Sequence, residues 1–385
     1  MHLTFLTGEY PPMQGGIADY TAILARNLQQ LAVTPAILID QTYGQARLAE
    51  QVPVHPAVCN WGFQSWADIK QFLSRYPTDV LHIQYQAAAF DLKGWINWLP
   101  WGLRRWSGCP KIVTTFHDLR IPYLFPKAGL LRWQAILTLA RYSHAVICTN
   151  SEDRARLEQY PWADHISQIP LGNNVPLNPP ADYDRQAWRK KLGFAEQTVG
   201  LAYFGFLNES KGGEELMAVL ASLVARGIDA RLLMIGGDVG DSDPTNRHYA
   251  RRVRQLMAEQ NLTERVIFTG YVDLPQVSAH LLAADLAVMP YRDGVSFRRT
   301  TLLAVLQHGL PVISTRPAVA LPQLVEGENM LLVPPGDVAG LTEQIIRVVD
   351  DRRLKNQLGQ GAGQLAADFD WDQIASQTAT LYSGL

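Results

Sequence analysis

The sequence is poor in cysteine and in long apolar segments. Its 385 residues include three cysteines, Cys59, Cys109 and Cys148, which lie far apart and form no CxxC pair. This pattern predicts neither a disulfide framework nor a zinc site, and it favours a reducing compartment. No window reaches the roughly 18 apolar residues of a membrane-spanning helix, and the N-terminus lacks the basic and apolar segments of a signal peptide. We therefore expect a cytoplasmic protein whose contact with a membrane, if it has one, is peripheral.

Charge is scarce as well. Charged residues make up 18% of the chain, with 34 Lys and Arg against 36 Asp and Glu. This near-neutral balance argues against a general electrostatic affinity for nucleic acid. Hydrophobic residues make up 47%, which is typical of a globular protein with well-buried sheets. The length predicts two domains of roughly 200 residues or fewer each.

Short apolar segments alternate with helical patterns along the whole chain. Strands are predicted at residues 2–7, 35–39, 80–84, 111–116 and 145–149, and again at 199–205, 231–235, 265–269, 286–289 and 311–314. This alternation predicts doubly wound α/β domains with parallel sheets and a ligand crevice at the carboxyl ends of the strands. A segment rich in Pro, Gly and Asn at residues 169–181 reads as a linker between two such domains.

Polar residues follow several of the predicted strands in the first domain. His82 lies in one of these strands, and the pairs His117–Asp118 and Asn150–Ser151 follow two others. A histidine at such a place is often a hydrogen-bonded structural residue, and that alternative stays open for both. His117 is the better candidate for a functional role because it falls where folds of this kind bind ligands.

A pair of glycines, Gly15 and Gly16, precedes the predicted helix at residues 17–31. Glycines at this place let the backbone turn tightly and approach a ligand closely at the helix start. The pair is not a GxGxxG motif, which argues against a dinucleotide-binding domain.

The segment at residues 283–315 combines a predicted strand, a polar loop, a helix at 300–308 and a second strand. The loop ends in Arg298 and Arg299, and Thr300 and Thr301 follow at the helix start. Two guanidinium groups, two hydroxyls and the unpaired N–H groups of a first helical turn make a good anion site, and a diphosphate fits it. The alternative is a solvated basic loop in which Thr300 only caps the helix.

A tryptophan-rich segment occupies residues 90–106. Four tryptophans, Trp95, Trp98, Trp101 and Trp106, are interspersed with the basic residues Lys93, Arg104 and Arg105. This mixture suits a membrane interface. Because Pro100 and Gly102 interrupt a long helix, we favour the alternative that these aromatic side chains pack against the first sheet.

Taken together in their order and spacing, short motifs along essentially the whole chain resemble the retaining nucleotide-sugar glycosyltransferases of family 4, which have the GT-B architecture. The motifs are Gly15-Gly16-Ile17-Ala18-Asp19-Tyr20, His82-Ile83-Gln84, Thr115-Phe116-His117-Asp118, Thr149-Asn150-Ser151-Glu152, Ile169-Pro170-Leu171-Gly172, Phe204-Gly205-Phe206 with Lys211-Gly212, Gly270-Tyr271-Val272 and Gly309-Leu310-Pro311-Val312. The resemblance implies an acceptor-side domain at residues 1–175, completed by a helix at 368–385, and a nucleotide-sugar-binding domain at 176–367.

The resemblance also implies roles for individual residues. Lys211 and Gly212 match the diphosphate-binding motif, and Gly15, Gly16, Tyr271 and the Arg298–Thr301 segment complete the expected donor-binding set. His117 is the candidate for orienting the donor sugar, and Asp19 is a candidate on the acceptor side. The expected partners are a nucleotide-sugar donor and a glycan or lipid-linked acceptor. Because cations and helix N-termini supply positive charge, no metal cofactor is expected; Asp241 and Asp243 are interpreted as solvated turn residues.

The chain departs from the family pattern at two places. Phe206 stands where the family has an arginine after the glycine. The family's paired glutamates are missing as well, since the second falls on Ala304 and the first on Ser296 or, with an insertion, on Asp293. We infer that Arg298, Arg299 and the two threonines replace the lost binding capacity. A non-catalytic nucleotide-sugar-binding subunit and another GT-B enzyme, such as an epimerase, remain alternatives.

Overall fold

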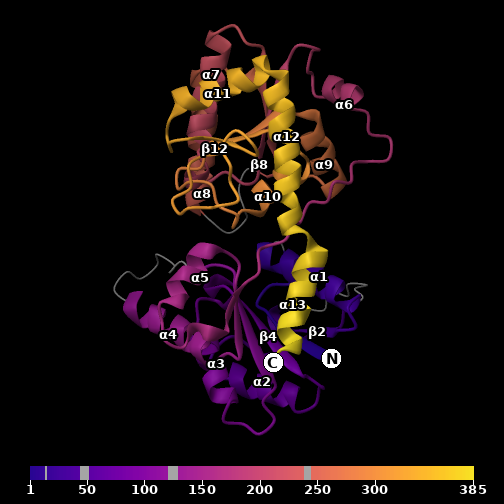
Figure 1. Cartoon of the computed structure of the whole chain (residues 1–385), viewed down its shortest axis with the longest axis vertical. Helices are drawn as coiled ribbons and strands as arrows, with labels where there is room; N and C mark the ends of the chain where they lie inside the picture. Colours follow the sequence, from indigo (N-terminus) through magenta and orange to yellow (C-terminus); the bar gives the residue numbers. More distant parts are fainter. Residues whose placement is uncertain (14, 44–51, 120–128, 238–243) are drawn as a thin grey trace. The chain divides into compact units, whose positions relative to one another are not determined.

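The computed structural model describes residues 1–385 except 14, 44–51, 120–128 and 238–243 (Figure 1). The chain divides into two compact units. Unit 1 comprises Met1–Asn174 together with Asp370–Leu385, and unit 2 comprises Val175–Phe369. The chain thus enters unit 2 inside the predicted linker at residues 169–181 and leaves it just before the last helix.

Unit 1 is built on a seven-stranded parallel sheet in the order β3-β2-β1-β4-β5-β6-β7. Its strands are β1 His2–Leu6, β2 Thr34–Asp40, β3 Val54–Val58, β4 Val80–Tyr85, β5 Lys111–Phe116, β6 Ala145–Cys148 and β7 Ile166–Gln168. Its helices are α1 Gly16–Gln29, α2 Ser65–Leu73, α3 Trp95–Leu103, α4 Gly129–Tyr142, α5 Ser151–Glu158 and α13 Trp371–Ser383. The central strands are buried on both faces, as the alternation of strands and helices requires.

Unit 2 has a six-stranded parallel sheet in the order β10-β9-β8-β11-β12-β13. Its strands are β8 Val199–Phe204, β9 Ala230–Ile235, β10 Val266–Phe268, β11 Leu286–Met289, β12 Val312–Thr315 and β13 Leu331–Val333. Its helices are α6 Arg185–Lys191, α7 Gly213–Ala225, α8 Pro244–Glu259, α9 Leu274–Ala283, α10 Thr300–Gln307, α11 Val338–Asp350 and α12 Arg352–Ala366. The two sheets with their crossover helices are Rossmann-like α/β domains, so the predicted fold class is confirmed.

The strands that the sequence pattern did not predict are β3, β7 and β13, and each lies at an edge of its sheet. Two of them span three residues, Ile166–Gln168 and Leu331–Val333. The third contains Pro56 and is partly exposed over most of its length. A short or half-exposed edge strand does not need the continuous apolar segment by which a buried central strand is recognised.

The last helix, α13, packs on unit 1 beside α1 (Figure 1). Two aromatic residues of α13 make hydrogen bonds to the rest of unit 1. Trp371 donates its indole N–H to the carbonyl oxygen of Asn173 at 2.7 Å, and the Tyr382 hydroxyl lies 2.5 Å from Nδ1 of His82. The other ring nitrogen of His82 lies 2.7 Å from the hydroxyl of Thr115 on β5. The end of the chain is therefore tied into the polar interior of the unit 1 sheet.

His82 is a structural histidine in this arrangement. It is fully buried, and burial together with the nearby His117 lowers its pKa to about 3. The imidazole is therefore neutral near pH 7, with one nitrogen that donates and one that accepts. Tyr382 and Thr115 supply the two complementary partners.

We expect Tyr382→Phe to lower the free energy of unfolding by about 1–3 kcal/mol, because it leaves a buried imidazole nitrogen without its partner. Ser383→Ala is the matched control, since Ser383 is exposed on the next position of the same helix. Denaturant unfolding of the two variants measures the difference. Equal stabilities would contradict the assigned role of the Tyr382 hydroxyl.

Candidate active site

In unit 2 the strand order reverses between β8 and β11, which are neighbours in the sheet. From β8 the chain proceeds to β9 on one side, and from β11 it proceeds to β12 on the other. The loops that leave the two carboxyl ends therefore diverge, which is where open α/β sheets bind ligands. These loops are residues 205–212 after β8 and residues 290–299 after β11.

Lys211 and Thr301 meet at the carboxyl end of β8, against Gly205. A Cβ atom on Gly205 would lie 3.1 Å from Nζ of Lys211 and 3.1 Å from Cγ2 of Thr301. Gly205 also has a φ of +120°, which side chains rarely adopt. The glycine thus leaves room for a cation and a hydroxyl-bearing residue from two separate loops to come together.

The ammonium group of Lys211 lies in a poorly solvated, positive environment. Burial, with a further contribution from Arg299, lowers the pKa of Lys211 to about 8. Among the described residues, none of the ion pairs provides Lys211 with a carboxylate. A half-buried cation without a carboxylate partner is stabilised when an anion binds beside it.

The loop after β11 places its two arginines differently. The guanidinium group of Arg299 pairs with the carboxylate of Asp293 and stacks on the ring of Tyr291, 3.9 Å from the centroid. Arg299 is therefore positioned by its own loop, and Asp293 offsets part of its charge. Arg298 is partly buried, with its backbone N–H 3.3 Å from the hydroxyl of Ser296.

Helix α10 begins at Thr300 with Arg299 as its N-cap residue, and the Arg299 side chain makes no capping hydrogen bond. Thr300 is thus the first helical residue, so the interpretation of Thr300 as a simple helix cap is wrong. The first-turn N–H groups and the side chains of Thr300 and Thr301, both partly exposed, lie at the positive end of the helix. Thr301 at the start of α10 therefore lies beside Lys211.

The structure reveals a residue that the sequence analysis did not single out. Arg292 pairs with Glu215 at 2.7 Å, with Glu214 and with Glu209 at 3.3 Å, and its backbone N–H donates to the carbonyl oxygen of Ser210 at 2.8 Å. These contacts tie the loop after β11 to the segment that carries Lys211. The sequence carries no clear signal for this role, because Glu214 and Glu215 at the start of α7 are already favoured there by the helix dipole.

The structure places the two positions at which the chain is expected to depart from the family pattern. Ala304 is fully buried in α10, so no carboxylate projects from the position of the second glutamate. Phe206 is 43% exposed, and its ring covers Gly237, where an added Cβ would lie 3.2 Å from Cε1. Tyr271 is 76% exposed. Two exposed aromatic rings therefore follow β8 and β10, the strands on either side of β9.

No group of three or more potential metal ligands occurs among the residues that the structure describes. Asp241 and Asp243, interpreted above as turn residues, lie outside the described residues.

In unit 1 the order reverses between β1 and β4, and His117 follows β5, the next strand along. Its Nε2 atom lies 2.8 Å from Oε1 of the fully buried Gln84, and its backbone N–H donates to the carbonyl oxygen of Tyr85 at 3.1 Å. The ring of Tyr20 meets the imidazole edge-on, with centroids 4.8 Å apart. Burial lowers the pKa of His117 to about 3, so the imidazole is neutral, and a proton on Nε2 leaves Nδ1 as an acceptor.

The glycine pair lies at the start of α1, where Gly15 is the N-cap residue. A Cβ on Gly15 would lie 2.3 Å from Oε2 of Glu9, so a carboxylate of the chain itself sits over this turn. Burial raises the pKa of Glu9. No Cβ contact restricts Gly16, and Asp19 is exposed in the first turn of α1. The structure thus places an acidic group beside Gly15, and Glu9 joins the candidate residues.

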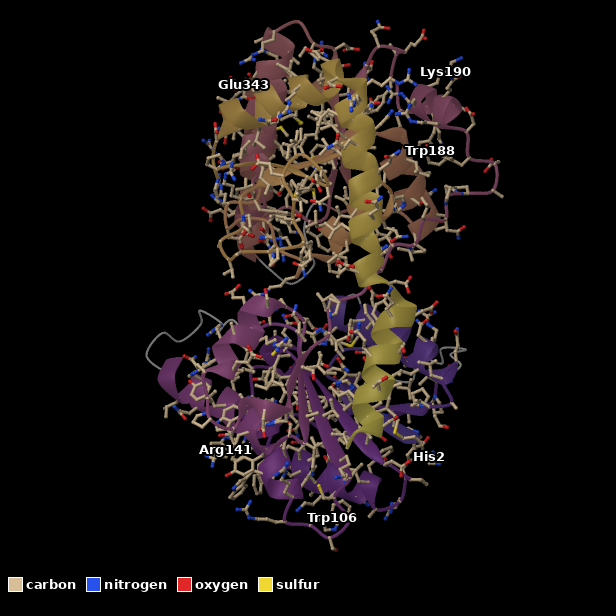
Figure 2. All side chains as sticks on the ribbon, viewed as in Figure 1. His2, Trp106, Arg141, Trp188, Lys190 and Glu343 are labelled. Carbon is tan, nitrogen blue, oxygen red and sulfur yellow. The ribbon has the colours of Figure 1, made fainter. Side chains whose placement is uncertain are left out.

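The tryptophan-rich segment forms α3 and the turn after it. Trp95 and Trp98 are exposed, at 44% and 43%. Trp106, labelled in Figure 2, packs instead against the hydrophobic core cluster of unit 1. Arg105 lies over the ring of Trp101, 3.8 Å from its centroid. Trp95 also contacts Phe63, which is 66% exposed. The segment therefore combines core packing at its end with an exposed aromatic patch at its start, made by Phe63, Trp95 and Trp98. Among the described helices, none is long and apolar enough to cross a bilayer.

Two family models match the chain, one in each half. Residues 15–172 match a glycosyl transferase 4-like domain, and residues 198–351 match glycosyl transferases group 1. A D-inositol 3-phosphate glycosyltransferase of Corynebacterium efficiens is 29% identical over 57% of this chain and 51% of its own length. A GDP-mannose-dependent phosphatidylinositol monomannoside mannosyltransferase of Mycolicibacterium smegmatis is 22% identical over 99% of this chain and 98% of its own length. The chain matches about half the length of the first of these relatives.

Solved structures show the same fold. HepE of Anabaena in complex with UDP matches with a TM-score of 0.80 at 19% identity, over all of both chains. Sucrose-phosphate synthase of Thermosynechococcus elongatus matches with a TM-score of 0.75 at 21% identity, over 100% of this chain and 98% of the other.

Gly212 is the position at which the loop around Lys211 is most sensitive to a side chain. Its φ is +72°, and an added Cβ would lie 2.0 Å from the carbonyl oxygen of Pro290. We expect Gly212→Ala to destabilise the protein by about 1–3 kcal/mol more than Gly227→Ala, because overpacking adds to the backbone strain that both variants share. Gly227 is the matched control, with a φ of +80° and open space around its Cβ. Thermal unfolding compares the two variants, and equal losses would show that Pro290 does not restrict this position.

Proposed function

We propose a function for this chain, which belongs to family 4 of the glycosyltransferases (glycosyl transferases group 1) and has the GT-B fold. It is an enzyme that transfers a sugar from a nucleoside diphosphate sugar to an acceptor hydroxyl, with retention of the anomeric configuration. The observation that carries the proposal is the half-buried cation of Lys211 between Gly205 and Thr301, beside Arg299 and the N-terminus of α10. A diphosphate supplies the negative charge that this arrangement lacks.

The proposed reaction breaks the bond between the anomeric carbon and the leaving phosphate oxygen and forms a bond from that carbon to the acceptor oxygen. Negative charge develops on the departing diphosphate, so fixed positive charge beside it lowers the barrier. Lys211, Arg298, Arg299 and the first turn of α10 are the groups assigned to this role. The acceptor proton passes to the departing phosphate, which balances the reaction without a separate base.

We assign His117 to the donor sugar. A neutral imidazole whose Nε2–H is held by Gln84 presents the Nδ1 lone pair as a hydrogen-bond acceptor. Such a lone pair suits a sugar hydroxyl and favours positive charge at the anomeric carbon. Asp19, Glu9 and the Gly15–Gly16 turn are then assigned to the acceptor side.

The proteins that this chain resembles differ in the base of their nucleotide. HepE of Anabaena binds UDP in its crystal structure, whereas the Mycolicibacterium enzyme is GDP-mannose-dependent. For this chain, the exposed rings of Phe206 and Tyr271 are suited to stack on either base. We expect no requirement for a divalent metal, since basic side chains and a helix N-terminus supply the positive charge.

A second candidate function is a nucleotide-sugar-binding subunit without transferase activity. The observation that favours it is the fully buried Ala304, which leaves the glutamate position of the resembled family without a carboxylate. Tight binding of a donor with no release of nucleotide in the presence of any acceptor would support this candidate.

The proposal predicts that one of UDP, GDP or ADP stabilises the protein, with CMP and NAD as comparison ligands and with or without magnesium. A ligand at about one hundred times its dissociation constant raises the free energy of unfolding by roughly 2.7 kcal/mol. Because only the protonated amine attracts the diphosphate, affinity should fall as the pH rises through about 8, the pKa of Lys211. Lys211→Arg should remove this pH dependence, since arginine stays charged.

Lys211→Met provides the loss-of-charge control for the same titration. We expect it to weaken nucleoside diphosphate binding about tenfold or more, since a charge-assisted hydrogen bond contributes about 1.5–3 kcal/mol. If all five ligands leave the midpoint unchanged, or if the Lys211→Arg protein shows the same pH dependence as the parent, the assignment of Lys211 to the diphosphate is wrong.

A further inference from the structure

A cavity of about 390 Å³ lies in unit 2 at the amino ends of β11 and β12. Asp285 lines it directly before β11, and Pro311 lines it directly before β12. The candidate active site is at the carboxyl ends of the strands, so the cavity lies at the opposite edge of the sheet. Its volume falls within the range of about 300–1,000 Å³ that is typical of small-molecule sites.

Helix α10 separates this cavity from the candidate active site. The helix begins at Thr300, next to Thr301 and its neighbour Lys211. At its other end, the C-cap residue His308 lines the cavity, and α12, which packs on α10 (Figure 1), supplies the facing wall. Eight helical residues span about 12 Å. A molecule in the cavity therefore does not compete for the group assigned to the diphosphate.

The charge at the cavity comes from one carboxylate that three cations share. Asp285 pairs with Arg185 at 2.9 Å, with Arg189 at 3.0 Å and with Lys355 at 2.9 Å. Burial acts to raise the pKa of Asp285, but its hydrogen bonds and cationic neighbours lower it to about 2, so the carboxylate is ionised near pH 7. Among the ion pairs of the described residues, none gives these cations a second carboxylate. The four side chains together therefore carry a net positive charge.

Of the three cations, Lys355 on α12 is the one that lines the cavity. Arg185 and Arg189 reach Asp285 from α6, and both also donate to backbone carbonyl groups. They hold the carboxylate in place without help from Lys355. The Lys355 side chain is 33% exposed, and its ammonium group is carried on a flexible stem. A bound anion can thus contact Lys355 while Asp285 keeps its two arginines.

The wall formed by His308 is neutral. Its Nδ1 atom lies 2.7 Å from the carbonyl oxygen of Ala304, and its Nε2 atom lies 2.8 Å from the hydroxyl of Ser278. The carbonyl oxygen requires a proton on Nδ1, so Nε2 accepts the proton of the Ser278 hydroxyl. Both ring nitrogens are used within the protein. Beside them, Leu282 and Leu310 give the cavity apolar surface.

Two amide side chains complete the lining on the α12 side. Asn356 and Gln360 are four residues apart, so they lie one above the other on the same face of the helix. Both residues are exposed, and each amide can donate and accept hydrogen bonds. This pair suits the hydroxyl groups of a ligand, which also donate and accept.

We propose that this cavity binds a small organic anion that carries hydroxyl groups, with the anionic group on Lys355 and the hydroxyls on Asn356 and Gln360. The net positive charge of the cluster favours an anion over a neutral molecule, and the two amides favour a hydroxylated body over an apolar one. The anionic group is a phosphate ester or a carboxylate, since lysine attracts either as a point charge. The inference goes beyond the proposed function and does not depend on it.

Glucose 6-phosphate and gluconate are the probes for the two anionic groups, and glucose is the neutral comparison. Isothermal titration calorimetry on the full chain, at constant ionic strength, measures the dissociation constants. We expect at least one of the two anions to bind at least tenfold more tightly than glucose, and the anion that binds identifies the anionic group. Lys355→Gln should weaken its binding about tenfold or more, because a charge-assisted hydrogen bond is lost. Gln360→Ala should weaken it by a smaller factor.

Arg353→Gln is the matched control for the loss of charge. Arg353 is exposed on the same helix, two positions before Lys355, and it does not line the cavity. This variant should bind the anion as the parent does. Lys211→Met should also leave the affinity unchanged, because Lys211 lies beyond the other end of α10. Thermal unfolding without ligand verifies that each variant is folded.

The proposal is wrong if neither anion binds the parent protein, or if Lys355→Gln and Arg353→Gln have the same affinity. Loss of binding in Lys211→Met would also overturn it, because the anion would then occupy the candidate active site. If Lys355→Gln does not fold, the exposed position Gln360 decides, and unchanged affinity in Gln360→Ala contradicts the proposal. Failure of the proposed function is a separate result: the parent would bind no nucleoside diphosphate, whereas anion binding that depends on Lys355 would persist.

Discussion

The site in unit 2 depends on one electrostatic constraint, a lysine ammonium group held where water solvates it poorly and where its neighbour is an arginine. The cost of burying Lys211 beside Arg299 appears as its lowered pKa. Asp293 binds Arg299, and three glutamates bind Arg292. The acidic groups of the two loops are thus committed to holding the loops in place. Among the described residues, none of these ion pairs includes Lys211, and an anionic ligand is its natural complement.

Both units have a reversal of strand order in their sheet, but the residues at the carboxyl ends of the strands differ in charge. In unit 2 the reversal of strand order brings two loops together around a cation. In unit 1 the corresponding edge carries a neutral histidine, His117, held by Gln84, and a carboxylate, Glu9, over the turn at Gly15. The helix α13 packs against residues near this edge. The Tyr382 hydroxyl lies within hydrogen-bond distance of His82, and the rings of Trp371 and Tyr20 are in contact, with centroids 5.2 Å apart.

Much of the fold could be predicted from the sequence because each buried parallel strand gives a short, recognisable apolar segment. The segments at residues 111–116 and 286–289 are strands with those same bounds in the structure, since each is a short segment rich in β-branched or apolar residues between turn signals. The edge strands β3, β7 and β13 have no such clear segment because they are short or partly exposed.

The candidate site was predictable in residue type but not in pairing. The sequence indicated that Arg298, Arg299 and Thr301 lie at a helix start, and the glycine motif placed Lys211 at another. It could not show that Asp293 binds Arg299, because this pair depends on how the loop after β11 folds. It could not show that Arg292 joins the two loops, because that contact depends on where loops from separate strands meet. A similar limit applies to Glu9, whose approach to Gly15 depends on how the loop between β1 and α1 folds back on itself.

Lys211 is a half-buried cation of lowered pKa, and we propose that a diphosphate binds it. The most direct measurement is the rate at which an amine-reactive reagent modifies each lysine, followed by peptide mass spectrometry at a pH near 8, with and without the nucleoside diphosphate that binds. The account predicts that Lys211 reacts faster than Lys93 or Lys190, because more of it is unprotonated, and that the nucleotide protects Lys211 alone. A Lys211 that reacts no faster than those lysines and is not protected by the nucleotide would contradict the account.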